Sequence, residues 1–162
     1  MTVINSVKSV TNVVIAGLGG QGVLTASEIV ADVAAHAGLD VKKSELHGMS
    51  QRGGSVSSDV RFGPAVFSPM VPEGEADFLV VTEPDQVPVN ASMLAPKGTL
   101  IEPGQMQETK LRNQRSLNIA LLGVLSRHLQ FSAEAWIDSI RRRMPEKLHA
   151  ANIEAFELGR GA

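Results

Sequence analysis

The chain has 162 residues, a formal net charge of −2, no cysteine and a hydrophobic content of 43%. This length suits one ordinary domain with a real core, and the hydrophobic content excludes a disordered protein. The weak negative charge argues against nucleic acid as a partner, and the lack of cysteine excludes disulfides, thiol nucleophiles and cysteine-ligated zinc or iron–sulfur clusters.

The first predicted unit is a buried strand, a glycine-rich turn and an amphipathic helix. The strand covers residues 12–16, where an apolar, β-branched run is typical of a parallel strand buried on both faces. The helix covers residues 23–37, because apolar residues recur there at helical spacing, and Gly38 stands where a helix-terminating glycine belongs. A second strand is predicted over residues 40–46.

The middle of the chain is predicted to hold three further strands. Apolar and polar residues alternate over residues 55–62, which predicts a half-exposed strand. The turn signal Gly63-Pro64 favours a hairpin in which residues 66–67 return beside that strand. Buried strands are predicted over residues 77–82 and 98–101.

The later part of the chain is predicted to be irregular and then helical. Pro88 clashes with the preceding helical turn, so any helix after residues 77–82 is short or begins at Pro88. Residues 102–116 are polar and are predicted to form a connection. Helical spacing of apolar residues then predicts helices over 118–129, over 133–144 with Ser132 as N-cap, and over 148–156 behind Pro145.

Strands that alternate with helices, followed by helices alone, predict an α/β fold. We expect a Rossmann-like three-layer sandwich with a mostly parallel sheet, an antiparallel hairpin and a C-terminal helical tail over residues 117–159, in a single domain of residues 1–162. Residues 1–12 lack the apolar core of a signal peptide, and no apolar run approaches the ~18 residues of a membrane helix. We therefore expect a cytoplasmic protein without a membrane or nucleic acid as partner.

The turn Gly17-Leu18-Gly19-Gly20-Gln21-Gly22 matches the pattern G-x-G-x-x-G between a predicted strand and a predicted helix. Such glycines permit a tight turn, and the helix N-terminus offers free N–H groups to an anion. We expect a positive φ and a close approach at Gly19. A dinucleotide site also needs an acidic residue after the second strand, for which Glu45 is the candidate. A compact corner, a phosphate site and a nicotinamide or flavin site stay open as interpretations.

A second unusual stretch is His47-Gly48-Met49-Ser50-Gln51-Arg52-Gly53-Gly54-Ser55, which combines glycines with a cation, hydroxyls, an amide and an imidazole. Its glycines would let the backbone approach another group closely, and Arg52 has the donors to hold a carboxylate or phosphate. The alternatives are a solvated turn and a role at a ligand or subunit interface. Further along, Arg141-Arg142-Arg143 is either a docking patch for an acidic electron carrier or a solvated helix face.

The two glycine motifs resemble those of gamma-type subunits of 2-oxoacid:ferredoxin oxidoreductases, and most resemble the small (beta) subunit of the indolepyruvate:ferredoxin branch. The resemblance continues at lower specificity along nearly the whole chain. It includes residues 67–69, 72–77, 83–84, 118–123, 145–147 and 156–159. Relatives usually carry a longer segment between residues 101 and 118, so the sheet is expected to be one strand short here, or its edge to be filled by a partner.

The resemblance implies a complex that oxidatively decarboxylates a 2-oxoacid, an arylpyruvate such as indolepyruvate, to an acyl-CoA. Thiamine diphosphate, magnesium and [4Fe–4S] clusters are implied on larger partner chains, with coenzyme A as co-substrate and ferredoxin or another electron acceptor reached through those partners. This chain is implied to be an accessory gamma-type subunit that helps to enclose the thiamine and coenzyme A site and is inactive alone. A free-standing NAD(P)-binding oxidoreductase and a non-catalytic interaction scaffold are the alternatives.

The resemblance also selects the residues expected to face the cleft. No catalytic residue and no metal ligand is expected on this chain, because the thiamine ylid supplies the nucleophile. The implied contact residues of the coenzyme A and thiamine cleft belong to the two glycine motifs: Gly17, Gly19, Gly20, Gln21, Gly22, Ser50, Gln51, Arg52, Gly53 and Gly54.

Overall fold

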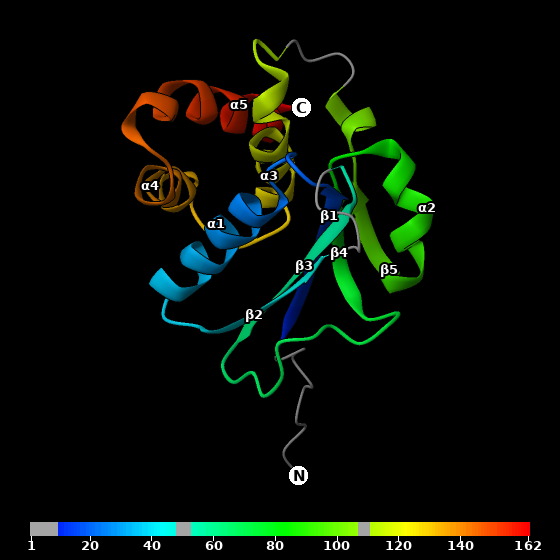
Figure 1. The fold of residues 1–162 in the computed structure, drawn as a ribbon. Helices are drawn as coiled ribbons and strands as arrows, with labels where there is room; N and C mark the ends of the chain where they lie inside the picture. Colours follow the sequence, from blue (N-terminus) through cyan, green and yellow to red (C-terminus); the bar gives the residue numbers. More distant parts are fainter. Residues whose placement is uncertain (1–9, 48–52, 107–110) are drawn as a thin grey trace.

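The computed structural model describes residues 10–47, 53–106 and 111–162, which form an open five-stranded sheet with most of its helices on one face (Figure 1). The strand order is β2-β3-β1-β4-β5. β1 pairs in parallel with β4, and β4 with β5, whereas β3 is antiparallel to both β1 and β2. The predicted α/β class is confirmed.

The elements follow the predicted order closely. The strands are β1 (Thr11–Leu18), β2 (Asp40–His47), β3 (Ser55–Gly63), β4 (Ala76–Val81) and β5 (Leu94–Ile101). The helices are α1 (Val23–His36), α2 (Val87–Asn90), α3 (Leu117–Ser126), α4 (Ala133–Arg143) and α5 (His149–Gly161). Short 3-10 turns lie at Pro84–Gln86, Ala91–Met93, Pro103–Met106, Gln114–Ser116 and Glu146–Leu148.

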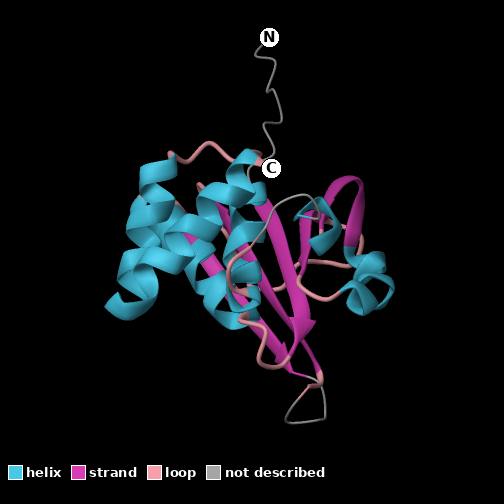
Figure 2. Ribbon diagram, turned by 90° about the horizontal axis from the view of Figure 1, so that it is seen from above, coloured by secondary structure: helices cyan, strands magenta, loops and turns pink. Residues whose placement is uncertain are grey.

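Helices cover the two faces of the sheet unequally. Alternate residues of β1 point to opposite faces, so that Val13 and Ile15 join the larger core under α1, α3, α4 and α5, while Val14 joins a smaller core on the other face. Figure 2 shows the long helices gathered on one side and α2 with its flanking turns on the other. The second cover is thin because Pro84 and Pro88 allow only one-turn helices there, as the position of Pro88 predicted.

The antiparallel hairpin is formed by β2 and β3, and the prediction that residues 66–67 return beside β3 is wrong. Hydrogen bonds with side chains of β2 and β3 keep the backbone of this segment from pairing with β3. The Val66 N–H donates to Asp40 Oδ2 at 2.8 Å, and the Val71 N–H donates to Asp59 Oδ2 at 2.9 Å. Asp59, which the alternation placed on an exposed face, is buried. This burial raises the pKa of Asp59, although the hydrogen bond from the Val71 N–H and the charge of Arg61 oppose that rise.

The helical tail packs through two glycines. Ser132 caps α4 as predicted, accepting the Ala135 N–H at 3.1 Å. α3 and α5 cross at Gly123 and Gly159, where a Cβ on Gly159 would overlap the Ala120 carbonyl and a Cβ on Gly123 would overlap the Phe156 carbonyl. The stretches 118–123 and 156–159, noted in the sequence as part of the resemblance, thus meet at this crossing.

The arginines near the end of α4 hold that helix against α1. Asp32 of α1 is buried and accepts from Arg142 Nη2 at 2.7 Å and from Arg143 Nε at 3.0 Å. Burial alone would raise the pKa of Asp32, but hydrogen bonds from Arg142, Ser139 and Arg143, together with the charge of Arg142, outweigh it and lower the pKa below its ordinary value. Arg142 and Arg143 keep 38% and 48% of their side-chain surface exposed while they pair with Asp32, so the solvated face describes them in part, and their neighbour Arg141 pairs with Asp138 at 3.5 Å. The docking patch for an acidic electron carrier stays a prediction.

The predicted connection over residues 102–116 contains two of the 3-10 turns, and its residues 107–110 lie outside the described part of the chain. Within the described ranges, no strand pairs with the outer edge of β5. In the same ranges, no helix combines the length and apolar character needed to cross a membrane.

Candidate functional site

The candidate site lies at the carboxyl ends of β1 and β4. After β1 the chain turns into α1 on one face of the sheet, and after β4 it turns into α2 on the opposite face (Figure 1). Ligands of open α/β sheets bind where neighbouring strands send their connections to opposite faces. The glycine-rich turn leaves β1 at this point, and Thr82-Glu83 leave β4 beside it.

The side chain of Gln21 fills the space between these two strand ends. Its Oε1 accepts from the Leu18 N–H and from Thr82 Oγ1, each at 2.8 Å, and its Nε2 donates to Glu83 Oε2 at 3.0 Å. The strand end itself is close-packed, because a Cβ on Gly17 would overlap Thr82 Oγ1. The Gln21 amide therefore ties the turn to β4.

The glycines of the turn serve different purposes. Positive φ occurs at Gly20 (90°) and Gly22 (75°) but not at Gly19, so the expected conformation of Gly19 is wrong. Its expected close approach does occur, since the Gly19 N–H donates to the Gly54 carbonyl at 2.8 Å and a Cβ would lie 3.4 Å from Gly53 N. This bond joins the two glycine motifs into one surface.

The second motif is described only at its ends. Gly53, with a φ of 69°, and Gly54 lead into β3, while Ser50, Gln51 and Arg52 lie outside the described residues. The His47 backbone is in β2, opposite Val56.

Glu45 does not take the role of a ribose ligand. β3 lies between β2 and β1, which places Glu45 two strand spacings, roughly 10 Å, from the glycine-rich turn. Its carboxylate accepts from Lys43 Nζ at 2.7 Å instead.

Sequence reasoning missed three side chains of this corner: Thr82, Glu83 and Asn118. Asn118 of α3 donates from Nδ2 to the Gly22 carbonyl at 3.0 Å, and among the described residues its buried Oδ1 is one of the few side-chain acceptors without a partner. A Cβ on Gly22 would overlap this amide, so Gly22 is required for α3 to pack there. The signal was available, because Thr82 ends a predicted buried strand and Glu83 directly follows it, and this strand neighbours β1.

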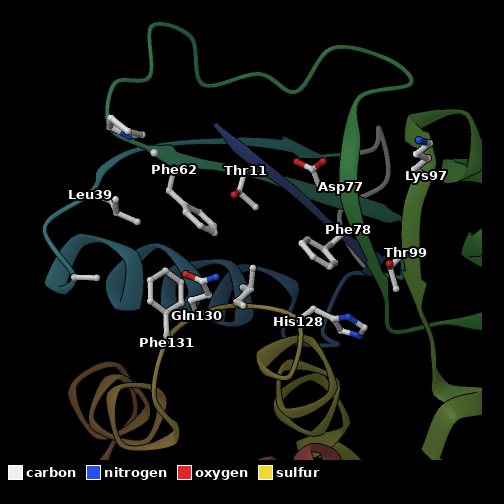
Figure 3. A pocket seen from close by; sticks show the side chains of 14 residues that line it. Thr11, Leu39, Phe62, Asp77, Phe78, Lys97, Thr99, His128, Gln130 and Phe131 are labelled. Atoms are coloured by element: carbon white, nitrogen blue, oxygen red, sulfur yellow. The ribbon is translucent and has the colours of Figure 1, made fainter. Parts of the chain in front are cut away.

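The corner contains a small hollow formed by the glycine-rich turn, the first residues of α1 and the start of β3. A hollow of about 300 Å³ lies against residues 18–20, 22–25 and 56. Among the described residues, no three His, Asp or Glu side chains are grouped so as to hold a metal ion. A larger cavity of about 680 Å³ lies at the opposite, amino edge of the sheet, where Phe62, Phe78, Phe131 and His128 project into it (Figure 3).

Of the interpretations of the turn, this geometry favours the compact corner over a dinucleotide phosphate site. The Leu18 and Gly19 N–H groups already donate to Gln21 and Gly54. Glu83, held by Gln21, places a carboxylate next to the N-terminus of α1, where a phosphate would be repelled.

Replacing Gln21 with leucine is expected to destabilise the chain by about 2 kcal/mol, because the Leu18 N–H would lose its acceptor and Thr82 Oγ1 would keep only the longer bond of 3.4 Å to the Ala16 carbonyl, while the side-chain volume stays similar. Urea unfolding followed by circular dichroism measures this loss. Gln130→Leu, at an exposed glutamine, is the matched control and should leave stability nearly unchanged. Equal stabilities of the two variants would contradict a tying role for Gln21.

The open, mixed sheet with a glycine-rich turn at its switch point identifies this chain as an α/β protein. The sequence profile of the family "Pyruvate ferredoxin/flavodoxin oxidoreductase" matches residues 12–104 and 104–162. The chain belongs to this family.

Individual relatives agree with this assignment. The indolepyruvate oxidoreductase subunit IorB of Thermococcus kodakarensis is 36% identical, with 91% of this chain and 93% of the relative covered. The protein of the same name from Pyrococcus horikoshii is 35% identical over the same shares. Both alignments span 188 positions, more than the 162 residues of this chain, and the two family matches meet at residue 104, in agreement with a shortened connection after β5.

Solved structures share the fold at low sequence identity. The 2-oxoglutarate:ferredoxin oxidoreductase of Magnetococcus marinus, solved with 2-oxoglutarate, coenzyme A and succinyl-CoA bound, superposes with a TM-score of 0.80 at 19% identity, covering 94% of this chain. This chain spans only 31% of that longer chain. Pyruvate oxidoreductase subunit PORC of Thermotoga maritima gives a TM-score of 0.74 at 20% identity and is covered over 95% of its length.

Proposed function

We propose that this chain is the accessory small subunit of a thiamine-dependent 2-oxoacid oxidoreductase of the indolepyruvate type. The complex would oxidatively decarboxylate an arylpyruvate such as indolepyruvate to its acyl-CoA and pass the electrons to ferredoxin or another acceptor. We place the complex in the cytoplasm. The names of the relatives and the family support this proposal.

The cofactors belong to the larger subunits in this proposal. Iron–sulfur clusters are held by cysteine thiolates, and this chain has no cysteine. Thiamine diphosphate with magnesium supplies the carbanion chemistry, the clusters carry electrons, and coenzyme A accepts the acyl group on those partner chains. What this chain contributes is a shaped, backbone-lined surface, and it would be inactive alone.

The observation that carries the proposal is the Gly19–Gly54 hydrogen bond of 2.8 Å. It fastens the base of the second glycine motif to the switch point of the sheet, the edge where α/β proteins bind ligands, and Ser50, Gln51 and Arg52 precede that base in the sequence. We propose that these residues, together with Gly17, Gly19, Gly20, Gln21, Gly22, Gly53 and Gly54, face the thiamine and coenzyme A cleft.

Arg52→Ala should lower the kcat/KM of the assembled complex for coenzyme A by roughly tenfold or more, because a charge-assisted hydrogen bond is worth about 1.5–3 kcal/mol. Steady-state kinetics of the reconstituted complex measures this effect. Arg141→Ala, which removes an exposed arginine of α4, is the matched control and should keep wild-type kinetics.

The outcomes separate the alternatives. Wild-type kinetics of the Arg52→Ala complex would favour a pure scaffold. Saturable binding of NAD or NADP to the purified chain would favour a free-standing nicotinamide enzyme, against the contacts of Gln21 and Glu83.

A further inference from the structure

The loop that joins β3 to β4, residues 64–75, presents an exposed aromatic side chain at the amino edge of the sheet. Phe67 is 94% exposed and Met70 is 53% exposed, the two most exposed of its large apolar residues. The loop lies at the lower end of the molecule in Figure 1, at the edge opposite the glycine motifs. It is called the Phe67 loop below.

The exposure of Phe67 is not a consequence of a loosely held loop. Val66 and Val71, on either side of it, are buried at 2% and 4% exposure. Three hydrogen bonds with side chains of β2 and β3 fix the backbone of this segment. The bonded pairs are Val66 N and Asp40 Oδ2 (2.8 Å), Ser68 O and Arg61 Nη1 (2.9 Å), and Val71 N and Asp59 Oδ2 (2.9 Å).

A backbone already ordered in the free chain loses little entropy on binding, which favours affinity. An aromatic side chain held outward on such a backbone has the properties of an interface anchor, since aromatic residues dominate the binding energy of protein interfaces. The free chain gains nothing from exposing it to water.

The surroundings of the Phe67 loop define the chemistry of its partner. Glu73 and Glu75 of the same loop are exposed carboxylates. The cavity of about 680 Å³ opens beside the loop, with Gly63 and Pro64 in its lining, and Figure 3 shows the loop running above it. The surface therefore combines an aromatic projection, exposed carboxylates and a hollow lined by both apolar and polar side chains.

We propose that the Phe67 loop is a docking surface for the larger, cofactor-bearing subunit, in which Phe67 enters an apolar pocket bordered by basic side chains. This inference rests on the proposed function and adds to it a second contact, at the edge of the sheet opposite the glycine motifs. In one solved structure with the same fold, the part that matches this chain makes up 31% of a longer chain. The rest of that longer chain is additional polypeptide that accompanies this fold.

A second copy of this chain is a poorer occupant. A symmetric contact through Phe67 would bring Glu73 and Glu75 of both copies together, and like charges at an interface are unfavourable. One loop also buries far less than the ~1,200 Å² of a stable dimer. As part of a wider interface with a large subunit, the same loop meets neither objection.

The test uses the purified chain and the co-expressed larger subunit. Phe67→Ser should leave the melting temperature of the isolated chain unchanged, because the side chain is 94% exposed, and should weaken binding to the larger subunit by roughly 30-fold, the size of an interface hot spot. Isothermal titration measures the affinity. Val89→Ser, at an apolar residue of α2 that is 61% exposed, is the matched control and should bind as wild type.

The outcomes are distinguishable from a failure of the proposed function. Equal affinities of wild type and Phe67→Ser would overturn the docking role and leave the proposed function intact. A wild-type chain that does not bind the larger subunit would overturn both. A wild-type chain that sediments as a dimer, and a Phe67→Ser variant that sediments as a monomer, would assign the surface to a second copy instead.

Discussion

Gly159→Ala is expected to destabilise the chain by about 3 kcal/mol, the upper part of the range for overpacked cores. At this chain length the melting temperature should fall by roughly 10 °C. The cause is the crossing of α3 and α5, where the new methyl group would overlap the Ala120 carbonyl carbon and oxygen. Backbone atoms cannot rotate aside as a flexible side chain can, so the two helices must separate and the buried Phe156 loses packing.

The matched control lies two residues further along the same helix. A Cβ on Gly161 would meet no atom within 4 Å, so Gly161→Ala should not destabilise, and alanine is the better helix former at an unobstructed position. Urea unfolding of both variants gives the comparison. If the two substitutions have the same sign and size, helix propensity alone acts at residue 159 and the close crossing is wrong.

Asp32→Asn is expected to cost about 2–3 kcal/mol at neutral pH, since it removes the charge from the hydrogen bonds with Arg142 and Arg143. The Asp32 side chain is only 3% exposed, whereas those of the arginines are 38% and 48% exposed. The arginines can regain water after the substitution, which keeps the cost below that of a fully buried pair. The exposed pair Asp138–Arg141 on the same α4 helix is the control, and Asp138→Asn should cost less than about 0.5 kcal/mol.

The effect of Asp32→Asn should depend on pH in a defined direction. The folded-state pKa of Asp32 is below its ordinary value of 3.8, so its stabilisation is fully present above that value and is lost as pH falls through the folded-state pKa. The raised pKa of Asp59 acts oppositely, because protonation of that buried carboxyl favours the folded state as pH falls. Subtracting the unfolding free energy of Asp32→Asn from that of wild type cancels the Asp59 contribution. A difference that persists unchanged well below pH 3.8 would contradict the ion-pair assignment.

Local patterns were sufficient for most of the secondary structure and for the position of the candidate site. The apolar spacing predicted α1 over residues 23–37 against the observed Val23–His36, and Ser132 was placed correctly as an N-cap. The glycine pattern located the turn at the end of β1. These features depend on backbone conformation within a few residues of chain, which is the range over which composition and spacing act.

The tertiary contacts of the glycine-rich turn could not be predicted in the same way. The Gln21–Glu83 bond joins residues 62 positions apart, and the Asp32–Arg142 bond joins residues 110 positions apart. Glu45 was the candidate ribose ligand because it is an acidic residue near the end of the second predicted strand, and the insertion of β3 between β2 and β1 removed it from the site.

By itself, the sequence determined the α/β class, the family resemblance and the place of the glycine-rich turn, because each depends on residues close together along the chain. Only the tertiary structure decided that Gln21 ties this turn to β4, that Gly19 bonds to the second motif, and that Arg142 and Arg143 serve Asp32. Those pairings depend on strand order and helix packing, which bring distant residues together once the apolar faces are buried.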